Sequence, residues 1–375
     1  MIDTPYSTFH DFNVVKRAHE VARLGKRSKS CVVKFEMAEP EHLTYLQIQL
    51  LTKTYQMGQY FSFVVYEPKP RKIQAVPYRD RIVQRLMCDH VLVPYFTQKI
   101  IYDNCGCVKG RGQHYAVARF KKFMGRFWHQ HRRNGWFLKC DIAKFFPSFS
   151  HDVIKAAMSS HITDPDVRKL FEHIVDSFHT EQAFLRKHNI PTHEDGKIIP
   201  RGVPIGNHTS QIIAVFYMNP LDRFLKEHLR IRNYIRYMDD FVIIHHDKEY
   251  LQNVLGQIRN FLRTELKLEL NAKTQIIPIK NGVKFLGRQF FLDDNGRVIV
   301  RVIKRTARRF KSCIKRINKY HADMEPSQIR SAICSYIGHF RRTNSRGKAA
   351  QIKRHLRVSI NKRESARNKM FDDFE

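Results

Sequence analysis

Apolar residues recur three and four positions apart over most of the 375-residue chain, and elsewhere they gather in short β-branched and aromatic runs. The first spacing predicts helices and the second predicts strands. Helices are predicted within residues 13–58, 80–96, 115–133, 151–178, 209–229, 249–266 and 302–375. Strands are predicted at residues 61–66, 73–76, 136–140, 234–237, 241–245, near 268–279 and at 283–292. Strands and helices therefore alternate in the middle third of the chain, which indicates a mixed fold.

Glycine and proline mark the predicted connections. Gly106, Gly110 and Gly112 stand among basic residues and predict a flexible basic loop. The polar stretch 187–202 contains Pro191, Gly196 and Pro200 and predicts a loop or a hairpin. A chain of this length can form two or three subdomains with sizeable cores.

A pair of adjacent acids interrupts the apolar strands in the middle of the chain. The residues Tyr237-Met238-Asp239-Asp240 join two of these strands, so a tight turn would place both carboxylates at the tip of a hairpin. Adjacent acids repel each other, and a pair held between buried strands therefore implies a bound cation. Asp293-Asp294 and Asp372-Asp373 lack such flanks and are interpreted as acidic turns in solvent.

A third acid, Asp141, follows the predicted strand at 136–140. Beside the Asp239-Asp240 turn it would complete a site for two metal ions, about 3.5–4 Å apart, that stabilises the attacking and leaving oxygens of an in-line displacement. Hard oxygen ligands and a phosphate substrate favour Mg²⁺, with Mn²⁺ as a substitute. The alternative role for Asp141 is that of a helix N-cap.

The charge balance indicates what the protein binds. Lys and Arg number 67 against 35 Asp and Glu, which gives a formal net charge of +32 and a pI of about 10.0. Such an excess points to a nucleic acid, because each neutralised phosphate releases condensed counterions. The plainer alternative is a solvated basic surface that serves solubility.

The cysteines and the apolar runs indicate the compartment. Seven cysteines are scattered without C-x-x-C spacing, which is typical of reduced thiols in a cytoplasm. No apolar run approaches the roughly 20 residues of a membrane span, and no signal segment is visible at the N-terminus. We therefore expect a cytoplasmic protein with no membrane partner.

These residues together resemble the reverse transcriptase family. Asp141 followed by Phe145-Phe146 is similar to its first palm motif, in which the aromatic residue five positions after the aspartate excludes a 2′-hydroxyl. The resemblance implies that Phe146 is this steric gate. Residues 202–211 are similar to the second palm motif, and residues 268–274 to the next, whose lysine, here Lys273, faces the triphosphate.

Two further segments extend the resemblance over residues 60–290, in the order of the family. Residues 283–287 resemble the primer grip, and residues 68–72 lie where the family holds the incoming triphosphate; Arg71 is chosen there for its forked guanidinium. The implied nucleotide-binding residues are Arg71, Phe146, Ile205, Gly206, Gln211 and Lys273. The implied metal ligands are Asp141, Asp239 and Asp240, which are also the catalytic residues, together with Ile142. The implied nucleic-acid contacts are Phe285, Leu286, Gly287, Arg308 and Arg309.

The resemblance implies an α+β right-hand polymerase with fingers, a ferredoxin-like palm with an antiparallel sheet, and a helical thumb. The expected boundaries are 1–135 for the N-terminal helices and fingers, 136–290 for the palm with the polar insert 181–201, and 291–375 for the basic thumb and tail. The implied activity is RNA-directed DNA synthesis from deoxynucleoside triphosphates with two Mg²⁺ ions. An RNA template and its cDNA are the implied partners, and an accessory protein or a second copy of the chain stays open as a further one.

One motif points to a subgroup. The Ile-Gly-x-x-x-Ser-Gln form at residues 205–211 departs from the commoner Gln-Gly-x-x-x-Ser-Pro. It is similar to reverse transcriptases of bacterial diversity-generating retroelements and to related lineages implicated in anti-phage defence. The insert 181–201 and the basic tail depart from the diversity-generating type, so we expect a dedicated non-coding RNA to be copied in defence or in a related retroelement. Two alternatives stay open: an error-prone enzyme of a diversity-generating retroelement, and a maturase-like protein that binds structured RNA.

Overall fold

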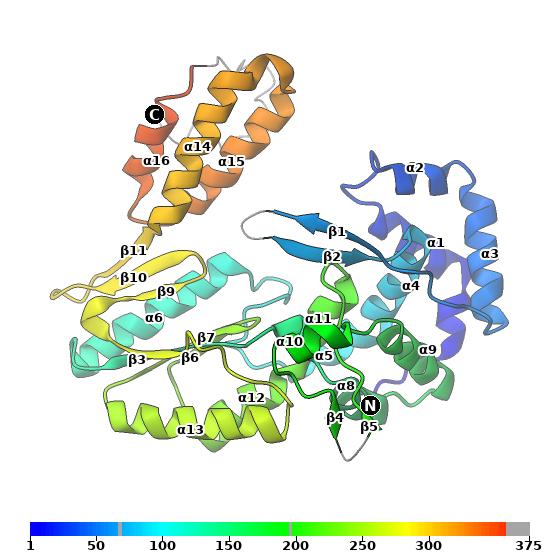
Figure 1. Cartoon of the computed structure of the whole chain (residues 1–375), viewed down its shortest axis with the longest axis horizontal. Coiled ribbons are helices and arrows are strands. Elements are labelled where there is room, and N and C mark those ends of the chain that lie inside the picture. The colour runs from blue at the N-terminus through cyan, green and yellow to red at the C-terminus, as the bar shows by residue number, and fades with distance from the viewer. Residues whose placement is uncertain (67–69, 195–196, 358–375) are drawn as a thin grey trace. The chain divides into compact units, whose positions relative to one another are not determined.

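The computed structural model describes residues 1–66, 70–194 and 197–357 (Figure 1). The contacts within the chain group it into two compact units. Unit 1 consists of residues 1–112, 140–241 and 253–274, and unit 2 consists of residues 113–139, 242–252 and those from 275 onward. The chain returns to each unit more than once, because strands that are distant in sequence pair in the same sheets.

Helices make up most of unit 1. They are η1 (Tyr6–His10), α1 (Phe12–Ala22), α2 (Ser30–Glu36), α3 (Glu39–Leu51), α4 (Tyr78–Met87), η2 (Cys88–Leu92), α5 (Val93–Lys99), α7 (Phe145–Ser148), α8 (His151–Met158), η3 (Ser159–His161), α9 (Pro165–Asp176), α10 (Gln182–Lys187), α11 (His208–Tyr217), α12 (Asn219–Arg223) and η4 (Phe224–His228). The helices of unit 2 are α6 (Gln113–His131), η5 (Ile279–Asn281), α14 (Lys304–Tyr320), η6 (His321–Asp323), α15 (Pro326–Arg341) and α16 (Arg346–Lys353), and α13 (Lys248–Thr264) contributes to both units.

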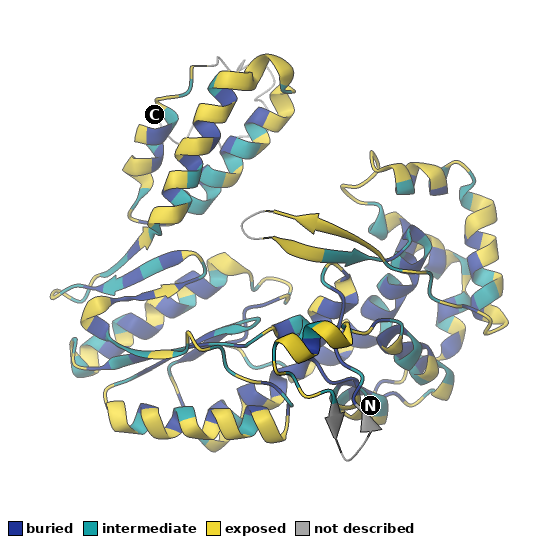
Figure 2. Cartoon of the chain, viewed as in Figure 1, coloured by how far each residue is buried: buried dark blue, intermediate teal, exposed yellow. Residues whose placement is uncertain are grey.

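The N-terminal helices of unit 1 pack around one apolar interior. Asp11 caps α1, because its carboxylate accepts a hydrogen bond from the Val14 amide at 3.0 Å. Helix α1 then packs against α3 and α4, and Val15, Leu46 and Ile82 are completely buried between them. Figure 2 shows these buried inner faces in dark blue.

A β-hairpin follows these helices. Strand β1 (Phe61–Val65) pairs antiparallel with β2 (Arg71–Ala75), so that Phe61 lies opposite Ala75 and Val65 opposite Arg71. All five residues of β1 are exposed. The predicted turn between the strands lies partly outside the described residues, since it includes residues 67–69.

A four-stranded sheet carries both predicted aspartate positions, namely Asp141 at the end of one strand and the Asp239-Asp240 turn between two others. Its strand order is β6-β7-β3-β8, with β3 (Trp136–Asp141), β6 (Tyr234–Tyr237), β7 (Asp240–His245) and β8 (Gln275–Pro278). Strand β3 pairs antiparallel with β8, from Trp136 opposite Pro278 to Lys139 opposite Gln275. The two central strands are apolar and buried, as expected for strands covered on both faces.

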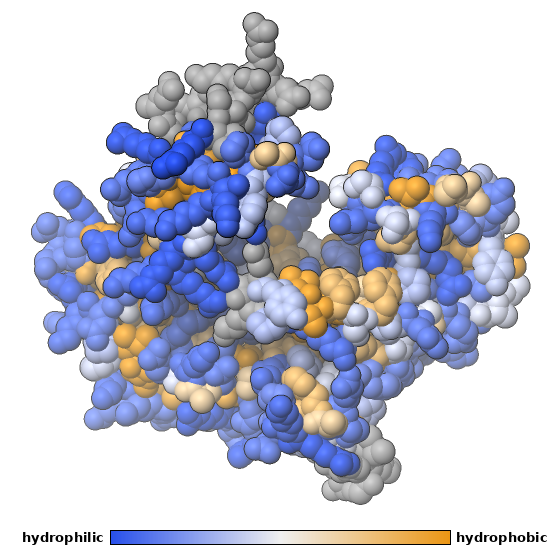
Figure 3. All heavy atoms as spheres, turned by 45° about the horizontal axis from the view of Figure 1, so that its top comes forward, coloured by the Kyte–Doolittle hydropathy of each residue, from blue (hydrophilic) through white to orange (hydrophobic). Residues whose placement is uncertain are grey.

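Unit 2 also contains a small sheet and a group of three helices. Strands β9 (Val283–Phe285), β10 (Arg288–Leu292) and β11 (Val298–Val302) form an antiparallel sheet in the order β11-β10-β9. Helices α14, α15 and α16 share a core built around Phe310, Ile333 and Phe340, while their outer faces are mostly exposed (Figure 2). Hydrophilic side chains cover most of the face drawn in Figure 3.

The helices predicted at 80–96, 115–133, 209–229 and 249–266 and the strands predicted at 61–66, 73–76, 136–140, 234–237 and 241–245 are confirmed within about three residues. The helical stretch at 13–58 is divided into α1, α2 and α3, and the one at 302–375 into α14, α15 and α16. Residues 358–375, with the predicted Asp372-Asp373 turn, lie outside the described residues. The polar stretch 187–202 contains a short hairpin, β4 (His193–Glu194) paired with β5 (Lys197–Ile198), which was one of the two predictions for it. Strand β11 was not predicted. None of the seven cysteines, all of which lie within the described ranges, is in a disulfide bond. None of the helices in those ranges is long and apolar enough to cross a membrane.

Candidate active site

Strands β6 and β7 are joined by the residues Met238 and Asp239, and Asp240 begins β7. Met238 has a φ of 58°, in the left-handed region that residues other than glycine seldom adopt. Both aspartates are partly exposed, while the strand residues on either side are largely buried. The predicted hairpin with an aspartate pair at its tip is therefore confirmed.

Residues 103–107 lie directly behind this turn. The Cys105 amide donates to the Arg236 carbonyl at 2.9 Å, and the Arg236 amide donates to the Asp103 carbonyl at 3.1 Å. A Cβ atom on Gly106 would lie 2.9 Å from Met238 Sδ and 3.0 Å from Met238 N, so the close approach requires glycine. Residues 103–105 therefore pair alongside β6, and the predicted loop with Gly106, Gly110 and Gly112 follows them.

Asp141 lies at the end of the sheet where the Asp239-Asp240 turn lies. Strands β3 and β7 are neighbours, and a Cβ atom on Gly135, just before β3, would lie 2.8 Å from the carbonyl of His245, the last residue of β7. The start of β3 therefore meets the end of β7, so the two strands are antiparallel. It follows that Asp141, at the end of β3, and Asp240, at the start of β7, lie at neighbouring strand ends.

The backbone around Asp141 also faces this edge. The Asn271 amide donates to the Asp141 carbonyl at 2.7 Å, and the Ala143 amide donates to the Glu269 carbonyl at 2.8 Å. Backbone groups alternate in direction along an extended strand, so the carbonyl of Ile142 points away from residues 269–271. That direction is the side on which β7 lies, so the Ile142 carbonyl points toward the strand that Asp240 begins.

Two adjacent phenylalanines follow Asp141 and have different surroundings. Phe145 is 5% exposed and packs against Phe149 with ring centroids 4.7 Å apart. Phe146 is partly exposed, and its carbonyl accepts from the Val203 amide at 3.1 Å. Phe145 is therefore a core residue, and Phe146 is the ring with an open face.

The loop at residues 202–206 lies between Phe146 and the β1–β2 hairpin. The Gly202 amide donates to the Phe149 carbonyl at 2.7 Å, and the Gln74 amide of β2 donates to the Ile205 carbonyl at 3.1 Å. Gly206 has a φ of 126°, and a Cβ atom there would lie 3.0 Å from Ile73 Cγ2. The structure thus brings together four residues that the sequence assigned to one site: Asp141, Phe146, Ile205 and Gly206.

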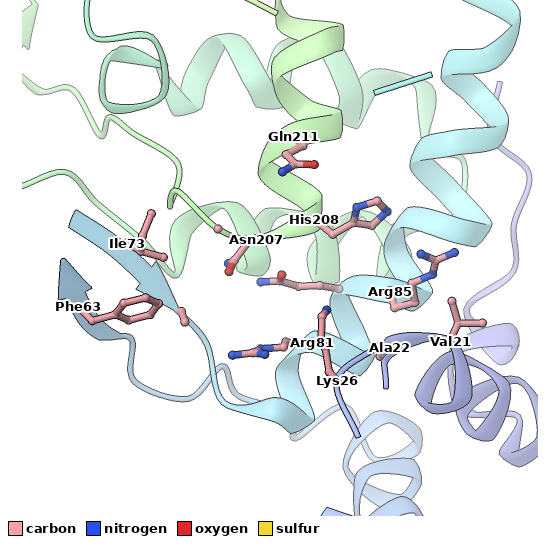
Figure 4. Close-up of a pocket in the computed structure, with 13 residues that line it drawn as sticks. Val21, Ala22, Lys26, Phe63, Ile73, Arg81, Arg85, Asn207, His208 and Gln211 are labelled. Atoms are coloured by element: carbon pink, nitrogen blue, oxygen red, sulfur yellow. The ribbon is translucent and has the colours of Figure 1, made fainter. Parts of the chain in front are cut away.

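Gly206 also lines a pocket of about 440 Å³ (Figure 4). Lys26, Arg81 and Arg85 line it, together with Gly206, His208 and Gln211 from the second predicted palm motif and Phe63 and Ile73 from the hairpin. Gln84 also lines it; this side chain is 2% exposed, and its Nε2 donor has no hydrogen-bond partner in the part of the chain that the structure describes. The side chains that line the pocket therefore offer several hydrogen-bond donors and no carboxylate.

Electrostatics in this pocket favour an anion. Burial lowers the pKa of His208, and the nearby cations Arg85 and Lys26 lower it further. Arg85 is paired with Asp89 at 2.6 Å, and Arg81 donates to the Val76 carbonyl at 3.3 Å. The sequence predicted Gly206 and Gln211 as site residues but missed Gln84, because its partners in the pocket come from helices and loops far apart in the chain.

The two predicted phosphate ligands are exposed. Arg71 is the first residue of β2, and Lys273 lies in a turn in which its amide donates to Asn271 Oδ1 at 3.1 Å. Because the Asn271 amide is bonded to Asp141, this turn is tied to the end of β3. Gln211 is also exposed, on the first turns of α11.

The predicted nucleic-acid contacts all belong to unit 2. Phe285 is 1% exposed and packs against Phe120 with ring centroids 5.5 Å apart, so its side chain supports the core and does not face a ligand. Leu286 and Gly287 have φ values of 50° and 70° and form the turn that follows. On α14, the side chain of Arg308 is exposed, and that of Arg309 is partly exposed.

The oxygen donors at these strand ends are of the chemical type that Mg²⁺ prefers. Asp141, Asp239, Asp240 and the Ile142 carbonyl are hard oxygen ligands, which suit that ion. The carboxylate oxygens of the three aspartates do not form a group lying entirely within 4.8 Å, as one shared ion would need. Two ions spread their ligands over a wider site.

Among the described residues, the group that does meet that spacing is His19, Glu36 and Glu39. The sequence spacing of the histidines did not indicate this cluster, since its members come from α1, α2 and α3. Arg23 Nη1 lies 2.7 Å from Glu36 Oε1 and 3.7 Å from Glu39 Oε2. The arginine already supplies the positive charge that two neighbouring glutamates require.

Comparison with known proteins places this geometry. No curated protein sequence matches the chain. Among solved structures it is similar to a telomerase from Candida albicans in complex with a TWJ fragment of telomeric RNA, at 12% identity and a TM-score of 0.45, covering 86% of this chain and 60% of that one. It is also similar to an apo telomerase from Candida tropicalis truncated from its C-terminal domain, at 12% identity and a TM-score of 0.40, covering 65% and 56%. This chain thus spans less than two thirds of either.

A family profile described as reverse transcriptase (RNA-dependent DNA polymerase) matches residues 67–290, which is more than half of the chain. The matched stretch contains Asp141, the 202–206 loop and the Asp239-Asp240 turn. Its helices and antiparallel sheet form a right-hand polymerase fold. The chain therefore belongs to the reverse transcriptase family.

Proposed function

We propose that this protein is an RNA-directed DNA polymerase that copies a dedicated non-coding RNA into DNA, in anti-phage defence or a related retroelement. The observation that carries the proposal is the antiparallel pairing of β3 and β7, which sets Asp141 and Asp240 at neighbouring strand ends. Carboxylates gathered this closely, with Asp239 beside them, repel one another unless cations bind. A protein that only binds RNA has no need to gather acids against phosphate.

The proposed reaction joins a primer 3′-hydroxyl to a deoxynucleoside triphosphate. The hydroxyl oxygen attacks the α-phosphorus, and pyrophosphate leaves. Two Mg²⁺ ions, held by Asp141, Asp239, Asp240 and the Ile142 carbonyl, would supply charge stabilisation to the attacking and leaving oxygens. The chain's own contribution is to hold these four oxygen donors on neighbouring strand ends and a tight turn.

The residues around that edge select and hold the nucleotide. Arg71 and Lys273 are exposed cations that neutralise the triphosphate. The open face of Phe146 lies under the sugar, where the ring clashes with a 2′-hydroxyl. Ile205 and Gly206 complete the wall between Phe146 and β2, and the hydrogen bond from the Gln74 amide to the Ile205 carbonyl supports this placement.

The pocket beyond Gly206 receives the single-stranded template. Its three cations and the buried Gln84 donor suit a backbone phosphate, and Phe63 and Ile73 offer an apolar wall to a base. In unit 2, Leu286, Gly287, Arg308 and Arg309 hold the primer and duplex backbone. Lysines and arginines of this kind bind phosphates without regard to sequence.

Two other roles compete with this one. The isoleucine at position 205 favours an error-prone enzyme of a diversity-generating retroelement, because it offers no hydrogen bond to the nucleotide or template. The net charge of +32 also suits a maturase-like protein that binds structured RNA, with an accessory protein or a second copy as a further partner. Seven cysteines without a disulfide among them support a reducing bacterial cytoplasm as the setting.

A primer-extension assay separates these roles. The purified protein is given an RNA template, a DNA primer, deoxynucleoside triphosphates and Mg²⁺, and the RNA that copurifies with it is sequenced beside the DNA made from it. Extension of the primer and one recurrent RNA partner support the proposal. Tight RNA binding with no extension under Mg²⁺ or Mn²⁺ would favour the maturase-like role, and DNA with dispersed substitutions would favour diversification.

A further inference from the structure

A buried ion pair lies behind the aspartate turn. Asp222, on α12, and Arg236, on β6, are both 0% exposed. Arg236 Nε donates to Asp222 Oδ1 at 2.7 Å, and Arg236 Nη2 donates to Asp222 Oδ2. This two-point pairing fixes the plane of the guanidinium group, which is the geometry in which arginine and carboxylate match best.

The remaining donors of Arg236 reach two parts of the candidate site. Nη1 donates to the carbonyl of Met238 at 3.0 Å, and Nη2 donates to the carbonyl of Val215 at 3.1 Å. Met238 immediately precedes Asp239, and Val215 lies on α11, the helix that begins just after Gly206. One guanidinium group therefore contacts the aspartate turn, the helix of the second palm motif and its own buried counter-ion.

Further hydrogen bonds hold the counter-ion in place. Asp222 Oδ1 also accepts from the Tyr234 hydroxyl, and Asp222 Oδ2 accepts from Asn104 Nδ2 at 3.4 Å. Asn104 Oδ1 in turn accepts from the amide of Gly106 at 3.1 Å. The network thus includes Gly106, the residue that packs against Met238 from the other direction.

The turn needs such support. Met238 is held at a φ of 58°, a conformation that is unfavourable for an L-amino acid and persists only where the surroundings impose it. The Arg236 hydrogen bond fixes the Met238 carbonyl, and Gly106 fixes its amide and side chain. Because Arg236 is paired with Asp222, it provides this support without placing an unbalanced positive charge beside the carboxylates.

We propose that Arg236 is a positioning residue, which holds the Met238 carbonyl and thereby directs the Asp239 and Asp240 carboxylates toward their metal ions, and that Asp222 orients Arg236 for this purpose. This inference rests on the proposed polymerase function. The competing explanation is that the pair stabilises the fold alone. The two differ in what happens to metal binding when the Met238 contact is lost and the protein stays folded.

The main test variant is Arg236→Lys, with Tyr234→Phe as its matched control. A lysine keeps the positive charge for Asp222, but its single nitrogen cannot serve Asp222, Met238 and Val215 together. Tyr234→Phe removes one buried hydrogen bond to the same carboxylate and leaves the Met238 contact intact. Thermal unfolding reports the folded fraction of each variant. The double variant Arg236→Met with Asp222→Asn leaves no buried charge unpaired and serves if Arg236→Lys does not fold.

Mn²⁺ binding, followed by electron paramagnetic resonance without nucleotide or nucleic acid, is the readout that a purely structural role would not change. We expect Arg236→Lys to weaken Mn²⁺ binding by about 10–100-fold, the usual effect of losing a group that orients metal ligands. The kcat for primer extension should fall to a similar extent, while RNA affinity and the nucleotide KM change by less than about threefold. Tyr234→Phe leaves both Arg236–Asp222 hydrogen bonds and the Met238 contact in place, so it should change either measurement by less than about threefold.

The inference would be overturned if Arg236→Lys kept the Mn²⁺ binding and the kcat of Tyr234→Phe with no loss from wild type. It would also be overturned if both variants lost Mn²⁺ binding and kcat to the same extent. Failure of the proposed function gives a different pattern. A wild-type protein that binds Mn²⁺ at Asp239 but extends no primer would refute polymerase activity, and the Mn²⁺ comparison would still decide the role of Arg236. Mn²⁺ binding that is unchanged by Asp239→Ala would refute the metal site itself and this inference with it.

Discussion

Two aspartate pairs in this chain, Asp239-Asp240 and Asp293-Asp294, lie at hairpin turns and differ in what their carboxylates do. Asp293 follows β10, and its Oδ1 accepts from the amides of Asn295 at 3.0 Å and Arg297 at 2.7 Å. The Asp294 side chain is 85% exposed and pairs with Arg133. The second pair therefore closes its own turn and neutralises a surface cation.

The first pair is supported from behind instead. The turn that carries Asp239 and Asp240 is fixed by Arg236 through the Met238 carbonyl and by the close packing of Gly106. Groups outside the turn therefore hold its backbone. The two turns therefore differ in what holds their backbone: a carboxylate of the pair itself in one, and a buried guanidinium with a close glycine contact in the other.

The largest expected effect tests this difference directly. Asp239→Ala should reduce DNA synthesis by about 100-fold or more, because a metal ligand is lost, while RNA binding stays nearly unchanged. Asp294→Ala is the matched control and should retain wild-type activity. Primer extension and RNA binding are measured on both. Activity of more than a few per cent in Asp239→Ala would remove that residue from the site.

The adjacent phenylalanines give the same contrast in apolar residues. Phe146→Ala should admit ribonucleotides, because the smaller side chain leaves room for the 2′-hydroxyl. Phe145→Ala should instead lower the free energy of unfolding by about 3–5 kcal/mol, as is usual for a buried ring. Incorporation of ribonucleotides and urea unfolding are compared for the two. Ribonucleotide entry only in Phe145→Ala would move the gate to that residue.

A smaller effect is expected at the loop beside the first turn. Ile205 offers bulk but no hydrogen bond, and a contact that a mispair cannot satisfy is worth about 1–2 kcal/mol, or roughly tenfold in discrimination. Ile205→Gln should therefore lower the error rate by about that factor. Sequencing of the cDNA measures it. The same error spectrum with normal synthesis would mean that Ile205 only packs beneath the loop.

The cations of α14 should act through charge alone. Neutralising Arg308 and Arg309 to glutamine should weaken binding to all RNA and DNA sequences alike and reduce the slope of log affinity against log salt by about one unit per contact removed. Arg259→Gln, an exposed arginine on α13, is the control for loss of charge elsewhere. A loss confined to one sequence would indicate base or shape readout by this helix.

The smallest effect is expected at the turn that carries Asp293 and Asp294. Asp293→Ala removes an acceptor for two backbone amides and should lower the free energy of unfolding by about 0.5–1.5 kcal/mol without changing synthesis. Asp294→Ala should change stability less, since exposed ion pairs contribute little. Urea unfolding separates them. A loss of synthesis in Asp293→Ala would make the two turns alike and contradict the comparison.

The sequence by itself determined the local parts of this protein. Periodicity placed most helices and strands, because alternation and helical spacing are set by neighbours along the chain. The Asp239-Asp240 hairpin and the strand ending at Asp141 were also visible, since apolar strands and a turn are local signals. The resemblance to the reverse transcriptase family rested on the same short motifs and is confirmed by the profile match.

Tertiary structure decided how those parts are positioned. The motif assigned the gate to Phe146, but the difference in burial between Phe145 and Phe146 follows only from how the folded chain packs around them. The pairing of Arg236 with Asp222 joins a strand to a helix, and Gly106 reaches Met238 from more than a hundred residues away. Such contacts depend on which surfaces meet after the chain folds, and periodicity does not record them. For that reason the sequence identified the carboxylates, and only the folded chain showed what holds them in place.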